Sequence, residues 1–242
     1  GVVPDALIPV ELAPKWAPWP MRVSRHENGV VWIDLTVPKD QPAGVYRGQV
    51  VARAASATLA TLPLELEVLP ARLPPRPVAT MLYYGRTELA RRVGELPTSE
   101  RQLWTLLHRH RLAPVHAVLS PADVRAQLPA LDGSLYTSAA GYDGPAAGVG
   151  DGIVVLGRYG ALGDATPAAV QKVGAIADEL AAHDLLDPAR ADVVLYAEDE
   201  DCRSPRGAAW RSALARAPSA NARRVRVAWT CSEDPAAQPV DV

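Results

Sequence analysis

The chain has 242 residues, which is enough for one large domain or two smaller ones, each with its own core. Its 25 basic and 27 acidic residues leave a formal net charge of -2, with no basic tract and no basic stripe at helical spacing, so we expect no nucleic-acid partner. No apolar run approaches the roughly 20 residues that a membrane span requires, so we expect no span either.

The cysteine content and the common cofactor motifs exclude several further classes. Two cysteines, Cys202 and Cys231, are too few for a disulfide scaffold or a Cys-rich zinc site. Both would follow adjacent parallel strands, which leaves open a disulfide between them or two buried thiols. The sequence contains no phosphate-binding loop, no nucleophile elbow and no metal-ligand spacing, so we expect no cofactor and no metal.

The start of the chain bears on its processing. It begins at Gly1 without a methionine and without the apolar core of a signal peptide. We expect a soluble processed chain or an excised fragment, in a secreted, periplasmic or cell-surface location.

Residues 1–69 carry β patterns only. Three segments are rich in β-branched residues or alternate at period two, namely 30–37, 45–52 and 57–68. The prolines and the glycine of 38–44 predict a turn between the first two. We therefore expect a small antiparallel β-sandwich as the N-terminal domain.

A proline-rich linker over 70–77 marks the expected domain boundary, because its prolines cannot continue a central strand. Beyond it, over 78–242, the pattern changes to strands that alternate with amphipathic helices. A βα series of this kind predicts a parallel sheet with right-handed crossovers. The expected strands are 78–84, 115–119, 152–156, 192–197 and 225–230, and the expected helices are 99–111, 167–183 and 205–217.

Four consecutive acids, 198–201, follow the strand predicted over 192–197. In parallel α/β folds, ligands and catalytic groups gather at the carboxyl ends of the strands. Cleavage of a glycosidic bond needs two carboxyl groups that face it, so Asp199 and Glu200 are candidates for sugar chemistry. The alternative is an acidic first turn of the following helix, which the helix dipole favours.

Other candidate binding residues are aromatic or cationic. Tyr83 and Arg86 close the first strand of the second domain, and Trp229 closes the fifth, so all three are placed to reach the acids. Tyr142 lies in the long segment 129–152, which has no periodicity, and loops of this length are usually functional or mobile. Tyr83 and Trp229 are alternatively core residues, and Tyr142 is alternatively a tyrosine that packs the loop.

Three segments together carry a resemblance to a known family. They are Pro4-Asp-Ala-Leu-Ile-Pro9, Val37-Pro-Lys-Asp-Gln-Pro-Ala-Gly-Val-Tyr-Arg-Gly48 and Tyr196-Ala-Glu-Asp-Glu200. The combination resembles glycoside hydrolase family 123 and its uncharacterised relatives, in which an N-terminal β-sandwich precedes a (β/α)8 catalytic barrel. The usual family pattern is Asp-Glu-Pro, and Asp201 stands here in place of the proline.

The resemblance implies a mechanism in which the substrate assists its own cleavage. Asp199 would orient the acetamido group of a β-linked N-acetylhexosamine of the N-acetylgalactosamine type, and Glu200 would protonate the leaving oxygen. Neighbouring residues on an extended strand point in opposite directions, so this division of labour needs a turn of the backbone at the strand end. The pair Glu198 and Asp199 is the alternative register.

The overall expectation is an α/β protein with an incomplete barrel. We count about five of the eight strands that such a barrel needs. The chain is a piece of a longer protein, or other chains complete it, or its sheet is open. The function expected first is hydrolysis of a carbohydrate substrate, and the alternative is a non-catalytic carbohydrate-binding or cell-surface interaction protein.

Overall fold

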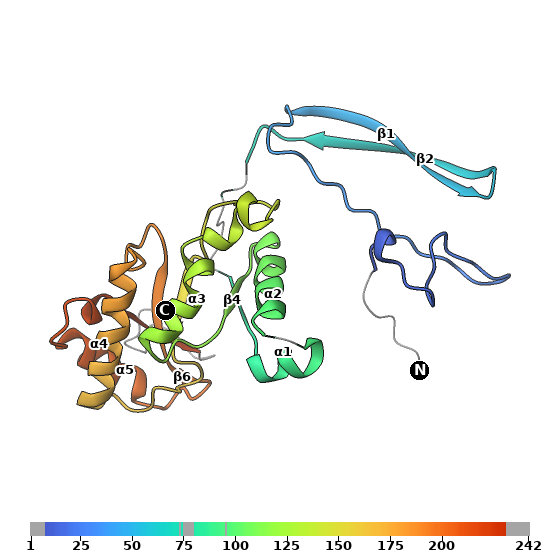
Figure 1. Cartoon of the computed structure of the whole chain (residues 1–242). Coiled ribbons are helices and arrows are strands. Elements are labelled where there is room, and N and C mark those ends of the chain that lie inside the picture. The colour runs from blue at the N-terminus through green and yellow to red at the C-terminus, as the bar shows by residue number, and fades with distance from the viewer. Residues whose placement is uncertain (1–7, 73, 75–79, 95, 231–242) are drawn as a thin grey trace. The chain divides into compact units, whose positions relative to one another are not determined.

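The computed structural model describes residues 8–72, 74, 80–94 and 96–230, and it divides the chain into two compact units, Gly1–Arg72 and Leu73–Val242 (Figure 1). The boundary between the units falls inside the proline-rich segment 70–77. Five α-helices and seven strands in small sheets confirm the α/β class for the described part of the chain.

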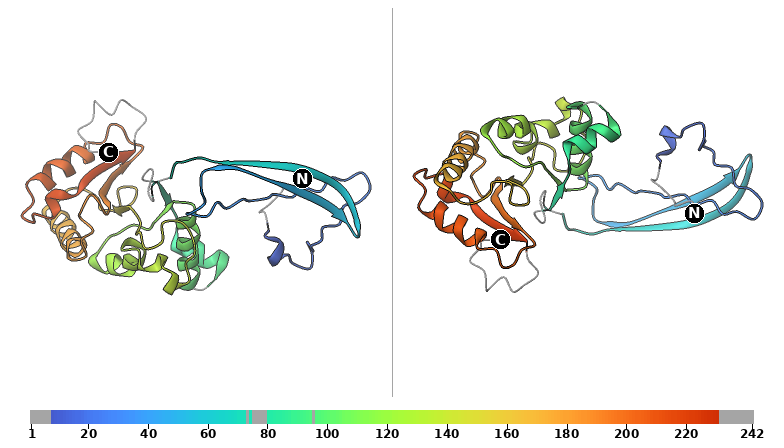
Figure 2. Two further views of the ribbon diagram at one scale, coloured as in Figure 1. Left: turned by 90° about the horizontal axis from the view of Figure 1, so that it is seen from above. Right: turned by 90° about the horizontal axis from the view of Figure 1, so that it is seen from below.

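The first unit contains one antiparallel pair of strands, β1 (Gly44–Ala54) and β2 (Ala57–Val68), which Figure 2 shows as a long twisted ribbon. The strands pair from Gly44 opposite Val68 to Ala54 opposite Ala57, with an irregularity at Ala52/Arg53. A 3-10 turn, η1 (Val10–Leu12), precedes them. The predicted strands 45–52 and 57–68 are therefore confirmed.

The predicted strand over 30–37 is wrong, because these residues form neither strand nor helix. Their β-branched composition suits a strand, but a strand also needs a partner edge. In the described part of this unit, β1 and β2 pair only with each other. The described residues thus form a two-stranded sheet and not the expected sandwich.

The second unit is built on parallel strands in chain order. β3 pairs with β4, and β5, β6 and β7 pair in that sequence. A bridge between Val118 and Leu156 joins the segment after β4 to β5. The five strands are β3 (Met81–Tyr83), β4 (Ala113–Val115), β5 (Ile153–Leu156), β6 (Asp192–Asp199) and β7 (Arg226–Thr230).

Helices connect these strands, and the three that sequence patterns predicted are confirmed to within a few residues. Two more were missed, although Ser120 caps one of them by accepting a hydrogen bond from the Asp123 backbone N–H. The α-helices are α1 (Arg86–Val93), α2 (Thr98–Arg109), α3 (Pro121–Leu131), α4 (Pro167–Ala182) and α5 (Arg206–Ala215), and three 3-10 turns are η2 (Ser134–Tyr136), η3 (Ser138–Ala140) and η4 (Ala222–Arg224).

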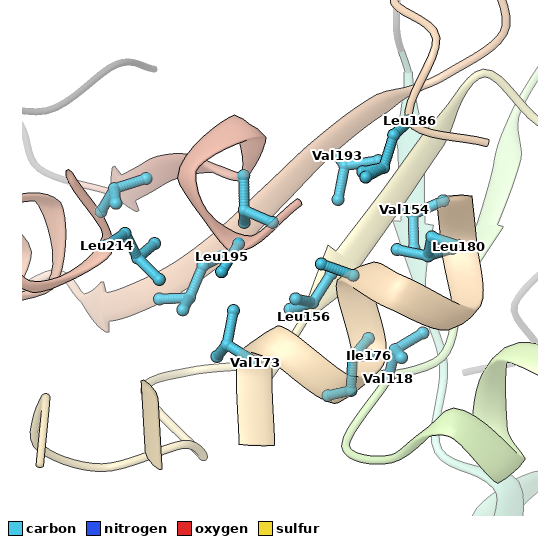
Figure 3. Packing of buried hydrophobic residues seen from close by; sticks show 14 of the residues in the cluster. Val118, Val154, Leu156, Val173, Ile176, Leu180, Leu186, Val193, Leu195 and Leu214 are labelled. Carbon is cyan, nitrogen blue, oxygen red and sulfur yellow. The ribbon is translucent and has the colours of Figure 1, made fainter. Parts of the chain in front are cut away.

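Alternating strand residues give this sheet two apolar faces. Val154, Leu156 and Leu195 pack against helix residues such as Val173 and Ile176 in the main core (Figure 3). The opposite face carries a second cluster of Val115, Val155, Val194 and Tyr196. Parallel strands in chain order are the arrangement of a βα barrel, but the described residues form no closed barrel.

Within the described residues, no helix combines the length and apolarity needed to cross a membrane.

Candidate functional site

The carboxyl edge of the parallel strands gathers a set of polar and aromatic residues from all five strands. Tyr84 follows β3, His116 follows β4, Arg158 follows β5, Asp199 ends β6 and Thr230 ends β7. Because the strands are parallel, all these residues lie at one edge of their sheets, which is the edge where parallel α/β folds bind ligands.

A β-bulge in β6 decides which way each acid points. Tyr196 pairs with Ala228 and Glu198 pairs with Trp229, so Ala197 is an extra residue on this strand. Without the bulge, Tyr196 and Asp199 would lie on opposite faces, since side chains alternate along a strand. With it, both lie on the face opposite the helices.

Asp199 is held there by two hydroxyl groups. The Tyr196 hydroxyl donates to Asp199 Oδ1 at 2.6 Å, and Thr230 Oγ1 donates to the same oxygen at 3.0 Å. The two hydroxyl oxygens are themselves 2.7 Å apart. Burial, and then the hydrogen bond to Asp199, raise the pKa of Tyr196 above its ordinary value, so this hydroxyl remains a donor at neutral pH.

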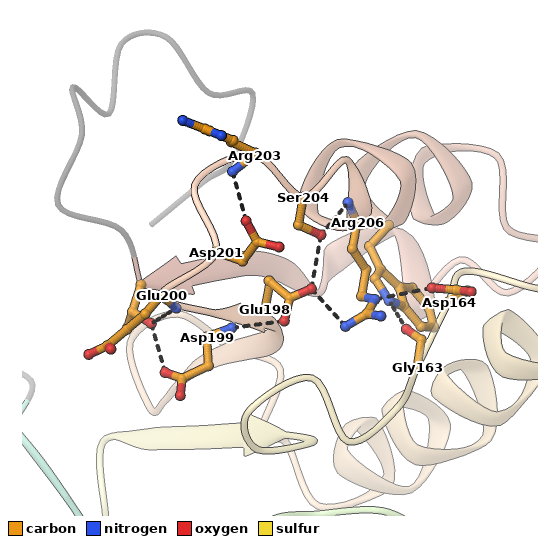
Figure 4. Close-up of polar contacts among 11 residues, drawn as sticks. Gly163, Asp164, Glu198, Asp199, Glu200, Asp201, Arg203, Ser204 and Arg206 are labelled. Carbon is orange, nitrogen blue, oxygen red and sulfur yellow. Dashed lines mark hydrogen bonds and ion pairs between the residues drawn. The ribbon is translucent and has the colours of Figure 1, made fainter.

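Glu200 turns the chain at the end of the strand. Its φ of 55° lies in the left-handed region, and its backbone N–H donates to the Thr230 carbonyl oxygen at 2.9 Å. This is the turn that two adjacent carboxylates need if both are to face one substrate. Figure 4 shows the two side chains at the strand end, and both residues are exposed.

Glu198 has a different role, because it is bound on the helix side of the strand. Its Oε2 accepts from Arg206 at 2.7 Å and from the Ser204 hydroxyl at 2.9 Å, and only 14% of its side chain is exposed (Figure 4). Arg206 also pairs with Asp164 at 3.1 Å. Because Glu198 is held by these contacts, the two carboxyl groups that could face one substrate are those of Asp199 and Glu200, rather than those of Glu198 and Asp199.

Three tyrosines cover the sheet beside Asp199. The ring centroid of Tyr83 lies 5.5 Å from that of Tyr159 and 6.0 Å from that of Tyr196. The rings of Tyr159 and Tyr196 are 5.7 Å apart, and Tyr159 is half exposed. Burial is the main cause that raises the pKa of Tyr83 to about 12. Tyr83 is thus brought to the candidate site as a partly buried aromatic.

Arg86 lies at the same edge in a buried-carboxylate network. Its Nε is 2.9 Å from Glu100 Oε1, and the Tyr84 hydroxyl donates to this oxygen at 2.6 Å. Trp104 Nε1 in turn donates to the Tyr84 hydroxyl at 2.8 Å. Burial, and then the charge of Arg86, lower the pKa of half-buried His116, whose ring lies 6.0 Å from that of Tyr84.

Tyr142, which the sequence suggests as a sugar-stacking residue, is buried, so the structure gives no support for that role. Only 1% of it is exposed, and its hydroxyl donates to the Pro145 carbonyl oxygen at 2.8 Å. Its ring packs edge-on against His108 and Tyr136, so no face is open to a ligand.

The long segment around Tyr142 is packed onto α2 rather than disposed over the acids. His108 stacks on Tyr136 with 3.5 Å between ring centroids, and its Nδ1 lies 3.5 Å from Asp151 Oδ1. The Tyr136 hydroxyl donates to the same carboxylate at 3.1 Å. These contacts give the segment a structural role.

Trp229, the other aromatic candidate for binding, is buried as well. It is 8% exposed, and it lies between Ala228 and Thr230, which face the Tyr196 side of the sheet. Alternation along β7 therefore directs the indole toward the helices, away from Asp199. Its Nε1 is buried and has no hydrogen-bond partner within the described part of the chain.

Sequence patterns missed several residues of this edge, namely Tyr196, Thr230, Arg158 and Tyr159. A usable signal existed, since Arg158 and Tyr159 come directly after a predicted strand and its glycine. No sequence pattern indicates that Tyr196 donates a hydrogen bond to Asp199, because the bulge at Ala197 is what places both residues on one face.

The predictions about a metal ion and about a disulfide also concern this edge. The described residues contain no group of three or more His, Cys, Asp or Glu side chains that could hold a metal ion. Cys231 lies outside the described residues, so its pairing with Cys202 remains a prediction.

Comparison of the chain with protein-family models, with curated proteins and with solved structures finds no match.

Proposed function

We propose that the chain carries the acidic centre of a glycoside hydrolase that cleaves β-linked N-acetylhexosamine by a substrate-assisted retaining mechanism. The observation that carries this proposal is the pair Asp199 and Glu200 at the carboxyl edge. Asp199 is fixed by the Tyr196 and Thr230 hydroxyls, and Glu200 lies at a turn beside it. The chain order of the parallel strands supports a (β/α)8-type barrel as the scaffold.

In this mechanism the two carboxyl groups do different work. Asp199, held as an acceptor by two hydroxyl donors, accepts the N–H of the substrate acetamido group and orients its carbonyl oxygen toward the anomeric carbon. That oxygen attacks as the C–O bond to the leaving group breaks. Glu200 donates its proton to the departing oxygen and then takes a proton from the water that opens the cyclic intermediate.

The experiment compares aryl N-acetyl-β-hexosaminides that have good or poor leaving groups. Glu200→Gln leaves no acid, so turnover of the substrate with the poor leaving group should fall by about 100-fold or more. A good leaving group departs without a proton, so that substrate should lose far less. Asp199→Asn should slow both, because ring closure depends on the oriented acetamide whatever leaves.

Steady-state kinetics on purified variants measure these effects, and Arg125→Gln on the exposed Arg125–Glu179 ion pair between α3 and α4 is the matched control. Wild-type rates for both acid variants on both substrates would overturn the proposal.

The exposure of Asp199 and Glu200 favours a second candidate, a non-catalytic carbohydrate-binding protein. A general acid works best where burial or neighbouring charge keeps it protonated, whereas exposed carboxylates are good acceptors for sugar hydroxyls. Saturable sugar binding without cleavage by the wild-type chain would support this candidate in place of the enzyme.

A further inference from the structure

Arg158 differs from Arg86 and Arg206 at the same edge because no acidic partner for it lies among the described residues. It is half buried, and its Nη1 donates to the Tyr84 carbonyl oxygen at 2.9 Å. No carboxylate in the described part of the chain forms an ion pair with it, whereas Arg86 binds Glu100 and Arg206 binds Glu198.

A half-buried guanidinium without an ion-pair partner is a favourable binding group for an anion. Partial removal of a guanidinium from water is costly unless hydrogen bonds or an opposite charge offset it. One backbone carbonyl satisfies only one of its five N–H donors. The remaining donors form a planar array that matches two oxygens of a carboxylate or a sulfate ester.

The loop that carries Arg158 is held in a tight conformation. Gly157, Tyr159 and Gly160 have φ angles of 66°, 52° and 70°. Tyr159 is a bulky residue in the left-handed region, and such positions persist where the surrounding structure enforces them, often where ligands bind. The Arg158 guanidinium carbon lies 5.1 Å from the centroid of the half-exposed Tyr159 ring.

Arg158 also lies next to the acids in the sheet. It follows β5, which pairs with β6, and its charge and that of Asp199 both act on the Tyr83 hydroxyl. The rings of Tyr83, Tyr159 and Tyr196 contact one another between the two groups, and of these three rings that of Tyr159 is half exposed while that of Tyr196 is buried. A sugar bound to Asp199 therefore has the Arg158 guanidinium in its neighbourhood.

We infer that the sugar recognised at this edge carries an anionic substituent, a carboxylate or a sulfate ester, which Arg158 binds. This inference rests on the proposed function, since it names the substrate class of the same site. The half-exposed ring of Tyr159 beside Arg158 provides an apolar surface for a pyranose, while the guanidinium supplies the charge.

The test measures equilibrium binding of three matched sugars to the full chain by titration calorimetry. The probes are N-acetylgalactosamine, its 6-sulfate and the corresponding 6-carboxylate, N-acetylgalactosaminuronic acid. Wild-type protein should bind at least one charged sugar on the order of tenfold more tightly than the neutral one, because hydrogen bonds to charged groups are strong. The tighter of the two charged sugars identifies the anion.

Arg158→Gln should abolish this preference, so that charged and neutral sugars bind equally, and Arg158→Lys should retain part of it. Arg125→Gln removes an exposed arginine outside the site and should change nothing. Equal wild-type binding of all three sugars would overturn the inference even if an Arg158 variant fails to fold, and so would an unchanged preference in Arg158→Gln.

Cleavage of the neutral aryl glycoside tests the glycosidase proposal without involving the charge that Arg158 would bind, so the two proposals can fail separately. Glu200-dependent cleavage of the neutral substrate without any charge preference would reject the role of Arg158 and leave the glycosidase intact. Arg158-dependent binding of a charged sugar without any cleavage would reject the glycosidase and support the recognition.

Discussion

One extra residue, Ala197, decides which face of β6 each of the acids that follow it occupies. Glu198 faces the helices and binds Arg206 and Ser204. Asp199 faces the tyrosine side, and Glu200 follows in a left-handed conformation. A run of acids alone does not distinguish these roles.

Glu198→Gln should destabilise the protein without affecting sugar binding. The substitution removes the charge that Arg206 pairs with in a mostly buried setting, and we expect a loss of about 1–3 kcal/mol in the free energy of unfolding. Asp199→Asn, at an exposed position, should change stability by less than about 1 kcal/mol. Urea denaturation measures both, and equal effects of the two substitutions would contradict the separation of roles.

Stability should decline at alkaline pH because the folded protein disfavours tyrosinate. Burial is the first cause that raises the pKa of five of the seven tyrosines, and it brings Tyr83 to about 12. The unfolded chain ionises near pH 10, so this stabilisation is complete below pH 10 and is lost as the pH rises toward 12. The five are Tyr83, Tyr84, Tyr136, Tyr142 and Tyr196.

Absorbance at 295 nm follows tyrosinate formation, and chemical denaturation at several pH values follows stability. Tyr83→Phe should reduce the loss between pH 10 and 12. Complete ionisation of all seven tyrosines near pH 10 in the folded protein would contradict this account.

Helices and strands with regular periodicity could be predicted from the sequence, whereas a bulge or the burial of a loop residue could not. The helix at 167–183 has a Thr166 cap and Pro167 in its first turn, and it forms as α4. The strand at 192–197 forms as β6, extended by two residues. The bulge at Ala197 and the burial of Tyr142 depend on neighbours distant in sequence, which a local pattern does not contain.

The hairpin β1–β2 should be far less protected than β6 against hydrogen exchange. No described residue of the first unit is buried, and a two-stranded pair without a packed face is marginal in water. Backbone amides of β6, within the main core, should exchange only through global unfolding. Exchange followed by mass spectrometry measures both, and equal protection of Val50 and Leu195 would contradict this expectation.

At the scale of the whole molecule, the sequence predicted the change from β-only to βα patterning, and the two compact units divide at that change. It also predicted the parallel strands and the edge where the acids lie. For the first unit the sequence predicted a β-sandwich, whereas the described residues form one pair of strands. Alternation of apolar residues predicts a strand, but it does not show which other strands pair or pack with it. For the molecule as a whole, we propose that the edge containing Asp199 and Glu200 recognises an N-acetylhexosamine through its acetamido group.

Recognition of the acetamido group can be measured with an N-acetylhexosamine thiazoline, a stable mimic of the cyclic intermediate. We expect the wild-type chain to bind the thiazoline about 100-fold or more tightly than the parent sugar, since an enzyme is complementary to the reacting species rather than the substrate. Asp199→Asn should remove this advantage, while Arg125→Gln should retain it. Equal affinity of the wild-type chain for the thiazoline and the parent sugar, or an advantage that survives Asp199→Asn, would contradict the account.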